Sequence, residues 1–373
     1  MVYHVIGLMS GSSLDGLDIA FVEFSETAGT WDYEIKRSAC IKYDAGWTRS
    51  LQGATHLSAL DYQLLHCSFG RFLGEKVRDF IEESGLQHKV NLIASHGHTT
   101  FHLPASKMTH QLGDGAAIAA ETRLPVVSDL RSMDVAFGGQ GAPIVPVGEK
   151  LLFPGHHYFL NIGGIANLSA DSKAISSSHA SGGQNTFIAF DICAANRVLN
   201  MLAAERNLDY DEDGKLASAG QVNEGLLGKL NALEYFSLPY PKSLANSFGT
   251  EVIYPLIKEF NLSTEDSLAT YTEHIAIQIK NALTPYFSKT QQQVMITGGG
   301  AFNTHLVSRI DACLQEINFE SFIPEDEVVI YKEALIMALL GTLRWREQYT
   351  VLASVTGASR NSIGGALWLG TEA

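Results

Sequence analysis

The stretch GLMSGSSLDGLD at residues 7–18 lies between two apolar runs and decides what fold to expect. Residues 2–8 and 18–24 have the apolar composition of buried strands, and the Gly and Ser residues between them are typical of a turn. Common phosphate loops instead lead from a strand into a helix, and this stretch has no Lys, so it is not a Walker A loop. It predicts a strand, a turn and a second strand.

The turn has the residue types that a phosphate-binding backbone needs. Small side chains at Gly11, Ser12 and Ser13 let backbone N–H groups approach a phosphate, and the two hydroxyl groups add donors. Asp15 and Asp18 can hold a magnesium ion, directly or through water. A plain hairpin with a polar turn explains the same residues without a ligand.

Two further Gly-rich turns follow along the chain. NIGGIAN at 161–167 lies between strands expected at 157–162 and 165–169, which suggests a duplicated hairpin. TGGGAFN at 297–303 follows a strand expected at 293–297 and precedes a helix expected at 303–317, whose N-terminus can face a phosphate. Each turn alone is a common feature. Together they suit one nucleotide held between two lobes.

The length of 373 residues and the 46% apolar content predict two domains of about 150–200 residues each. Strands alternate with helices, which favours α/β lobes. We expect a first lobe at residues 1–130, with 350–373 packing back on it, and a second lobe at 131–349. Helices are expected at about 58–84, 116–122, 194–206, 264–286 and 331–346.

Composition excludes several classes of function. The net charge of −14 and the absence of a basic stripe exclude a nucleic-acid partner. No apolar run reaches about 18 residues, and the N-terminus does not read as a signal peptide, so no membrane segment is expected. The four cysteines form no CxxC pair, as in proteins of reducing compartments. We therefore expect a cytoplasmic protein.

Three charged residues are candidates for chemistry. Asp191, at the end of the apolar run in FIAFDICAAN at 187–196, can accept a proton, or it can simply cap the next helix. Arg131, with two aspartates in DLRSMDVAFGGQGAP at 129–143, offers a fork of donors or forms a salt-bridged turn. Glu333 is expected at a helix start, where it can act in a site or compensate the helix dipole.

Taken in order, segments along the whole chain resemble the anhydro-N-acetylmuramic acid kinases. The matching segments are GLMSGSSLDGLD at 7–18, SHGHT at 95–99, QLGDGAAIA at 111–119, DLRSMDVAFGGQGAPIVP at 129–146, LNIGGIANLS at 160–169, FD at 190–191, DGKLASAG at 213–220, YPKS at 240–243, GGGAFN at 298–303, KEA at 332–334 and SVTGAS at 354–359. The resemblance implies two duplicated α/β lobes of the actin-like ATPase (ribonuclease H-like) type, with ATP and substrate in a central cleft.

The resemblance also implies a reaction and roles. ATP, with Mg²⁺, and water convert a 1,6-anhydro sugar to its 6-phosphate during recycling of cell-wall fragments. Asp191 corresponds to the base and Glu333 to a residue near the sugar and water. The implied nucleotide residues are Gly11, Ser12, Ser13, Leu14, Asp15, Gly16, Leu17, Asp18, Asn161, Gly163, Gly164, Gly298, Gly299 and Gly300. The implied sugar residues are His96, Arg131, Asn167 and Asn196. The direct metal ligands are not given by the sequence, and a homodimer stays open.

The chain departs from the family pattern at three places. The usual FDTGPGN is FDICAAN at 190–196, the usual SHGQT has His98, and Ser12 replaces Thr with its hydroxyl kept. We expect the first two departures to touch the sugar side of the cleft. They leave room for a kinase of another sugar, such as levoglucosan, and a non-catalytic sugar or nucleotide sensor is a third alternative.

Overall fold

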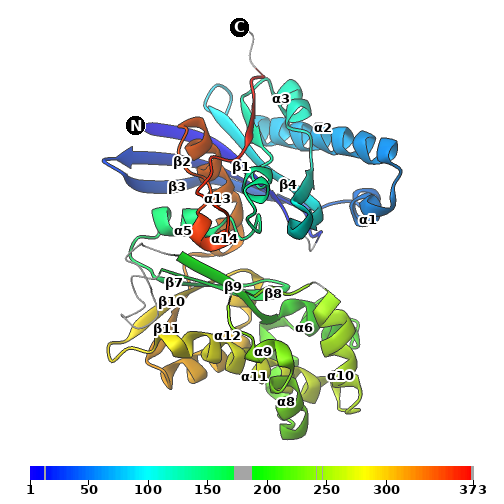
Figure 1. Cartoon of the computed structure of the whole chain (residues 1–373). Helices are drawn as coiled ribbons and strands as arrows, with labels where there is room; N and C mark the ends of the chain where they lie inside the picture. Colours follow the sequence, from blue (N-terminus) through cyan, green and yellow to red (C-terminus); the bar gives the residue numbers. More distant parts are fainter. Residues whose placement is uncertain (12–13, 172–186, 241, 246, 371–373) are drawn as a thin grey trace. The chain divides into compact units, whose positions relative to one another are not determined.

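The computed structural model describes residues 1–11, 14–171, 187–240, 242–245 and 247–370 (Figure 1). The chain divides into two units, each described here by itself. Unit 1 comprises Met1–Pro154 and Tyr331–Ala373, and unit 2 comprises Gly155–Ile330. These boundaries differ from the expected ones at 130 and 349. The segment after residue 130 stays in unit 1, where the Lys332 ammonium forms a buried ion pair with Glu149 at 2.9 Å.

The sheet of unit 1 is built on the predicted hairpin. β1 and β2 are antiparallel, β3 continues the antiparallel run, and β4 lies parallel to β1 on its other side. β6 then pairs with β4, β12 with β6, and β5 with the end of β4. The strands are β1 (Val2–Ser10), β2 (Leu17–Thr27), β3 (Thr30–Ile41), β4 (Leu92–Leu103), β5 (Met108–Leu112), β6 (Val126–Ser128) and β12 (Ala366–Trp368).

Helices cover both faces of this sheet. α2 begins at the N-cap Ser58 and buries Phe69, Leu73 and Val77 against the strands, as its helical spacing predicts. On the other face α13 comes so close to β1 that a Cβ on Gly7 would collide with the Ala334 carbonyl. The helices are α1 (Ala45–Gly53), α2 (Ala59–Glu83), α3 (Gly115–Thr122), α4 (Ser132–Ala136), α5 (Pro146–Leu152), α13 (Asp326–Trp345, which starts in unit 2) and α14 (Ala353–Thr356).

The sheet of unit 2 repeats the core of this arrangement. β7 and β8 form the second predicted hairpin, β9 extends it, and β10 and β11 run parallel to β7 on the other side. The strand order is β3-β2-β1-β4-β6 in unit 1 and β9-β8-β7-β10-β11 in unit 2, so the two sheets share one arrangement, with the second strand antiparallel and β5 added beside the end of β4 in unit 1. The repeat confirms the expected duplicated α/β lobes. The strands are β7 (Tyr158–Ile162), β8 (Ile165–Asp171), β9 (Phe187–Ala194), β10 (Gln292–Thr297) and β11 (Phe319–Phe322).

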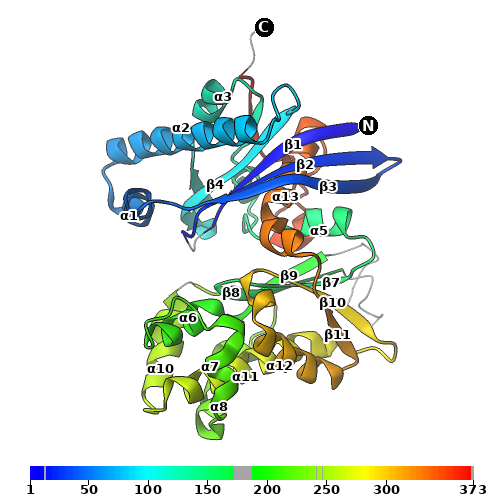
Figure 2. The same ribbon diagram turned by 180° about the vertical axis from the view of Figure 1, so that it is seen from behind.

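The helices of unit 2 gather on one face of its sheet (Figures 1 and 2). Leu160, Leu168 and Ile296 point to that face and join the core formed with the helices. The alternate residues of the same strands therefore point to the opposite face. The helices are α6 (Asn196–Ala204), α7 (Lys215–Ala219), α8 (Glu224–Asn231), α9 (Glu234–Ser237), α10 (Tyr254–Lys258), α11 (Thr264–Leu283) and α12 (Thr304–Gln315), with a π-helix at Phe248–Ile253.

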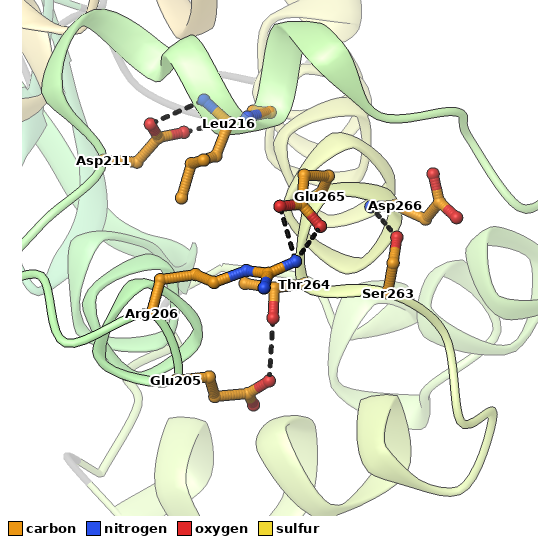
Figure 3. A network of polar contacts seen from close by, with 9 residues as sticks. Glu205, Arg206, Asp211, Leu216, Ser263, Thr264, Glu265 and Asp266 are labelled. Carbon is orange, nitrogen blue, oxygen red and sulfur yellow. Dashed lines mark hydrogen bonds and ion pairs between the residues drawn. The ribbon is translucent and has the colours of Figure 1, made fainter.

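Polar contacts connect the end of α6 with the start of α11 (Figure 3). One nitrogen of Arg206 donates to both carboxylate oxygens of Glu265 at 2.7 Å. Asp211, in the acidic stretch 209–214, accepts from the backbone N–H groups of Leu216 and Ala217 at 2.8 and 2.9 Å. This carboxylate therefore caps the start of α7.

Candidate functional site

The predicted phosphate turn joins β1 to β2 in unit 1. Ser10 pairs with Leu17 at the last rung of the ladder, so the turn starts and ends at these residues. Within it the Leu14 N–H donates to the Gly11 carbonyl at 3.3 Å, and Leu14 has a positive φ of 62°. The prediction of a strand–turn–strand is confirmed. Ser12 and Ser13 lie outside the described residues.

The aspartates of this turn have different surroundings. Asp15 is exposed in the turn, whereas Asp18 lies on β2 opposite Cys40 of β3. Burial raises the pKa of Asp18, and the hydrogen bond from the Cys40 thiol lowers it in part. Among the described residues, no group of three or more His, Cys, Asp or Glu side chains forms a preassembled metal site.

The two Gly turns of unit 2 meet at one end of its sheet. The carbonyls of Gly163 and Gly164 accept from the backbone N–H groups of Asn196 and Ala195, at 3.0 and 2.9 Å. The Asn196 side chain donates to the carbonyl of Ile162 at 3.1 Å. The structure thus brings together the turn after β7 and the start of α6.

The third Gly turn packs on the end of the same strand. A Cβ on Gly298 would lie 2.7 Å from the Asn161 side-chain oxygen, and Gly298 has a positive φ of 82°. Gly300 packs against the Ile162 side chain. Only glycine combines this backbone conformation with this close approach. Predicted nucleotide residues from two distant segments therefore lie at one place.

A row of four polar residues crosses the sheet of unit 2, on the face opposite to its helices. Register pairs Thr297 of β10 with Asn161 of β7, Asn161 with Asn167 of β8, and Asn167 with Asp191 of β9. Paired residues share one face of a sheet, so these side chains line up at one level. We call them the polar row. It joins a predicted nucleotide residue, a predicted sugar residue and the predicted base.

Asp191 is held by one segment of the chain. Its backbone N–H donates to the Lys242 carbonyl at 3.2 Å, and its carbonyl accepts from the Tyr235 hydroxyl at 2.6 Å. Its carboxylate oxygen Oδ2 accepts from the Leu244 N–H at 2.8 Å. Burial raises the pKa of Asp191, and the Leu244 bond lowers it in part. The carboxylate is thus oriented, and it binds a proton more readily than an ordinary aspartate.

The alternative interpretation of Asp191 as a helix cap is wrong. β9 continues to Ala194, and α6 starts at Asn196 after Ala195, which makes no side-chain capping bond. An extra residue in β9 at this point forms a β-bulge opposite Ala166 and Asn167. Asp191 therefore lies within a strand.

The altered residues 192–195 do not face the polar row. Ile192, Cys193, Ala194 and Ala195 are all buried in the core that the sheet of unit 2 forms with its helices. The expectation that these side chains touch the sugar is therefore not supported by their positions.

Arg131 and His96 come together in unit 1. The Arg131 Nε donates to the His96 Nε2 at 2.8 Å, and another guanidinium nitrogen donates to the Gly141 carbonyl at 2.6 Å. Burial, with the nearby Arg131 charge, lowers the pKa of His96 to about 3, so this ring is neutral. Its Nδ1 then donates to the Gly97 carbonyl at 2.8 Å. Asp134 instead accepts from Gly141 and Thr356, so it supports the loop structurally.

Glu333 interacts electrostatically with Arg131. Its position within the helix differs from the prediction. α13 begins at Asp326, so Glu333 is an interior helical residue and does not compensate the dipole in the first turn. Burial raises its pKa, while the charges of Lys332 and Arg131 lower it and those of Asp18 and Glu149 raise it. Acidic residues at 326 and 327 were a usable signal for the earlier start.

Sequence reasoning missed the residues that position the site. Tyr235, Lys242 and Leu244 hold Asp191. Thr297 completes the polar row, and among the described residues nothing bonds to its buried hydroxyl oxygen. Of these positioning residues, only Lys242 lies in a segment that matches the family, YPKS at 240–243. Contacts made by backbone groups leave no other trace in a sequence.

The comparisons with known proteins cover nearly the whole chain. The family model described as anhydro-N-acetylmuramic acid kinase matches residues 3–370. The chain belongs to the anhydro-N-acetylmuramic acid kinase family. Proteins named anhydro-N-acetylmuramic acid kinase from Vibrio parahaemolyticus and Shewanella sediminis are 31% and 32% identical to it. The alignments cover 97% of both chains in the first case and 98% in the second.

Solved structures are similar at a lower level. The activator of 2-hydroxyisocaproyl-CoA dehydratase from Clostridium difficile, with bound ADPNP, gives a TM-score of 0.42 at 18% identity over 92% of this chain and 96% of that one. Schistosoma mansoni hexokinase complexed with glucose gives 0.39 at 11% identity over 91% and 85%. Within the described residues, no helix has the length and apolar character that crossing a membrane requires.

Proposed function

We propose that this family member is an ATP-dependent kinase that opens the 1,6-anhydro ring of anhydro-N-acetylmuramic acid and yields N-acetylmuramic acid 6-phosphate. Membership of the family supports the substrate and the role in recycling cell-wall fragments. The observation that carries the chemistry is Asp191, an oriented carboxylate with a raised pKa beside Asn167. The proposed reaction consumes ATP, and this supports a cytoplasmic location for the protein.

Asp191 acts as the general base. Its carboxylate takes a proton from a water molecule, and the water oxygen bonds to the anomeric carbon. The bond from this carbon to the 6-oxygen breaks on the opposite face, as in an inverting glycosidase. The 6-oxygen takes the γ-phosphoryl group, and ADP leaves. One carboxylate suffices because the leaving oxygen is captured by phosphorus and needs no proton.

The nucleotide residues of the proposal belong to the Gly turns and to the ends of the strands beside them. In unit 1 they are Gly11, Ser12, Ser13, Leu14, Asp15, Gly16, Leu17 and Asp18. In unit 2 they are Asn161, Gly163, Gly164, Gly298, Gly299 and Gly300. Asp15 and Asp18 would hold Mg²⁺, since hard carboxylate oxygens suit this ion. When bound, the ion neutralises phosphate charge during transfer.

The sugar residues of the proposal supply fixed polar groups. Arg131 and neutral His96 are already bonded to one another, and Asn167 is paired with the base. Asn196 anchors the Gly163 turn. Glu333, with its raised pKa, would contact the sugar or the attacking water. Groups that are positioned before substrate arrives lower the cost of reaching the transition state.

A different anhydro sugar, such as levoglucosan, is the second candidate. The altered residues 192–195 are the observation that favours this candidate. Because these residues are buried in the core, they give it little support. A non-catalytic sensor would bind ATP without releasing ADP.

The deciding experiment is ADP release with anhydro-N-acetylmuramic acid, levoglucosan, N-acetylmuramic acid and glucose, run in ¹⁸O-labelled water. We expect turnover with the first sugar, one ADP for each sugar, and label at the anomeric hydroxyl with none in the phosphate. Turnover of another sugar alone would replace the proposed substrate. Label in phosphate would mean ATP hydrolysis instead, and nucleotide binding without turnover would favour the sensor.

A further inference from the structure

β4 changes the direction of its side chains at Gly97. Leu8 of β1 pairs with Ser95 of β4, and Ser10 pairs with His98. Between these two pairs β1 advances by two residues, whereas β4 advances by three. The extra residue forms a β-bulge, and Gly97 accommodates it with a positive φ of 71°. In a regular strand His96 and His98 would share a face, because side chains alternate with a period of two. The bulge separates them.

The two histidines accordingly have different neighbours. His96 contacts Arg131 on the face that α13 covers, where Ala94 of the same strand packs against Gly341. His98 instead bonds to Ser10. Ser10 lies on the same face of β1 as Ile6 and Leu8, which belong to the core that the sheet forms with α2. The structure therefore places His98 and His96 on different faces of the sheet, and the expected contact of residue 98 with the sugar side stays a prediction.

His98 belongs to a chain of three side chains. The Tyr43 hydroxyl donates to the Ser10 Oγ at 2.7 Å, and Ser10 Oγ lies 3.1 Å from the His98 Nδ1. A serine hydroxyl has one proton and two lone pairs, so Ser10 can donate to Nδ1 or accept from it, according to the His98 tautomer. Ser10 and His98 are 2% and 5% exposed, and the Tyr43 ring packs on Phe69 and Phe72. Ser10 and His98 are therefore buried and Tyr43 is half-buried, and ring packing holds Tyr43 in place.

Ser10 is the last residue of β1 and pairs with Leu17. Its side chain therefore anchors the base of the turn that follows at Gly11. Its two hydrogen-bond partners come from segments outside the hairpin, namely β4 and the residue before the N-cap of α1. A shift of Ser10 would move the first residues of this turn.

We propose that His98 is a positioning residue for the nucleotide turn, acting through Ser10, with Tyr43 as the second anchor. This inference rests on the proposed nucleotide role of the turn. According to this inference, the departure from the family pattern at residue 98 affects ATP binding and does not affect sugar recognition.

The test compares Ser10→Ala, His98→Ala and Tyr43→Phe with the wild-type chain. The control is His110→Ala, which removes a histidine bonded to Tyr62 in the same β4–β5 hairpin, away from Ser10. Calorimetry with ADP and with a non-hydrolysable ATP analogue gives the Kd, and initial rates give the KM of the sugar. We expect the nucleotide Kd to rise about threefold to tenfold in the three variants, which is what losing a buried hydrogen bond produces. The sugar KM should stay within about twofold.

Several outcomes would overturn the inference. These are an unchanged nucleotide Kd in folded variants, a rise in sugar KM alone, or an equal effect in the His110 control. Tyr43→Phe keeps the ring packing, so it decides the matter if the other variants do not fold. If the wild-type chain binds nucleotide but turns over no sugar, the proposed reaction is wrong. The role of His98 is then still decided by the nucleotide Kd values of the variants. A wild-type chain that binds no nucleotide would remove both.

Discussion

Asn167 on β8 faces Asp191 on β9 at the position where β9 carries one extra residue. The bulge leaves Asp191 on the face of the polar row, while Ile192 and Cys193 beyond it are both buried in the core. A regular strand would send one of these two apolar side chains to the polar face. The bulge thus lets a single strand supply the predicted base and a continuous core.

Replacing Asp191 by Asn should abolish most of the activity. The amide cannot take the proton from water, so we expect kcat to fall by roughly a hundredfold to ten-thousandfold. The Kd for ADP, measured by calorimetry, should stay within about twofold. Asp209→Asn, at an exposed carboxylate of unit 2, is the matched control and should keep the wild-type rate. A wild-type kcat for Asp191→Asn would remove this residue from the role of base.

Activity should depend on pH through the same carboxylate. Burial raises the pKa of Asp191 above the ordinary 3.8, and the base works only when it is ionised. We therefore expect kcat to fall on acidification with a midpoint above 3.8, measured at saturating ATP and sugar. Leu244→Pro removes the N–H group that favours the ionised form, so it should move the midpoint upward. A downward shift would show that this bond does not act on the base.

Stability should show the opposite trend. A carboxyl group with a raised pKa binds protons more tightly in the folded state, so its contribution is fully present at low pH and is lost as pH rises through the folded pKa. Asp18, Asp191 and Glu333 all have raised pKa values. Asp191→Asn should therefore raise the midpoint of urea unfolding at pH 7–8, with the gain vanishing toward pH 4. A gain that does not change with pH would contradict this explanation.

Arg131→Lys should separate charge from geometry at the sugar side. Burial lowers the pKa of Arg131 to about 10, so the side chain stays charged at neutral pH. Lysine keeps the charge but cannot reproduce both bonds of the guanidinium group. We expect the sugar KM to rise about tenfold, with the nucleotide Kd nearly unchanged. Arg123→Lys, at an exposed helix end, is the control, and an equal effect there would argue against a specific role.

The Lys332–Glu149 ion pair is buried at both ends and joins α13 to α5. Lys332→Met leaves a buried carboxylate without this partner, so unfolding in urea should cost about 3–5 kcal/mol less than in the wild type. Lys332→Met with Glu149→Leu removes both charges and should recover much of that loss. No recovery in the double variant would mean that the pair is not what stabilises this junction.

Much of the fold could be predicted because local signals agree with the final structure. The Gly and Ser turn between apolar runs gave the β1–β2 hairpin, and the helical spacing of Leu65, Phe69 and Leu73 gave α2. The predicted start of α13 at residue 331 is later than the observed start at Asp326, since the β-branched residues in its first turns are more typical of a strand than of a helix. The boundaries of the units depend on contacts between distant segments, such as Lys332 with Glu149, and no local pattern encodes these.

The residue types at the site are determined by the sequence alone. An aspartate ends an apolar run, Gly turns follow strands, and an arginine lies beside a Gly-rich loop, because each type is needed where it stands for its own chemistry or backbone geometry. Which of these residues meet, and on which face, was decided only by tertiary structure. Single extra residues in β4 and β9 change the face of every side chain beyond them, and strand register links residues far apart in the chain. A period of two read along one strand cannot reveal either effect.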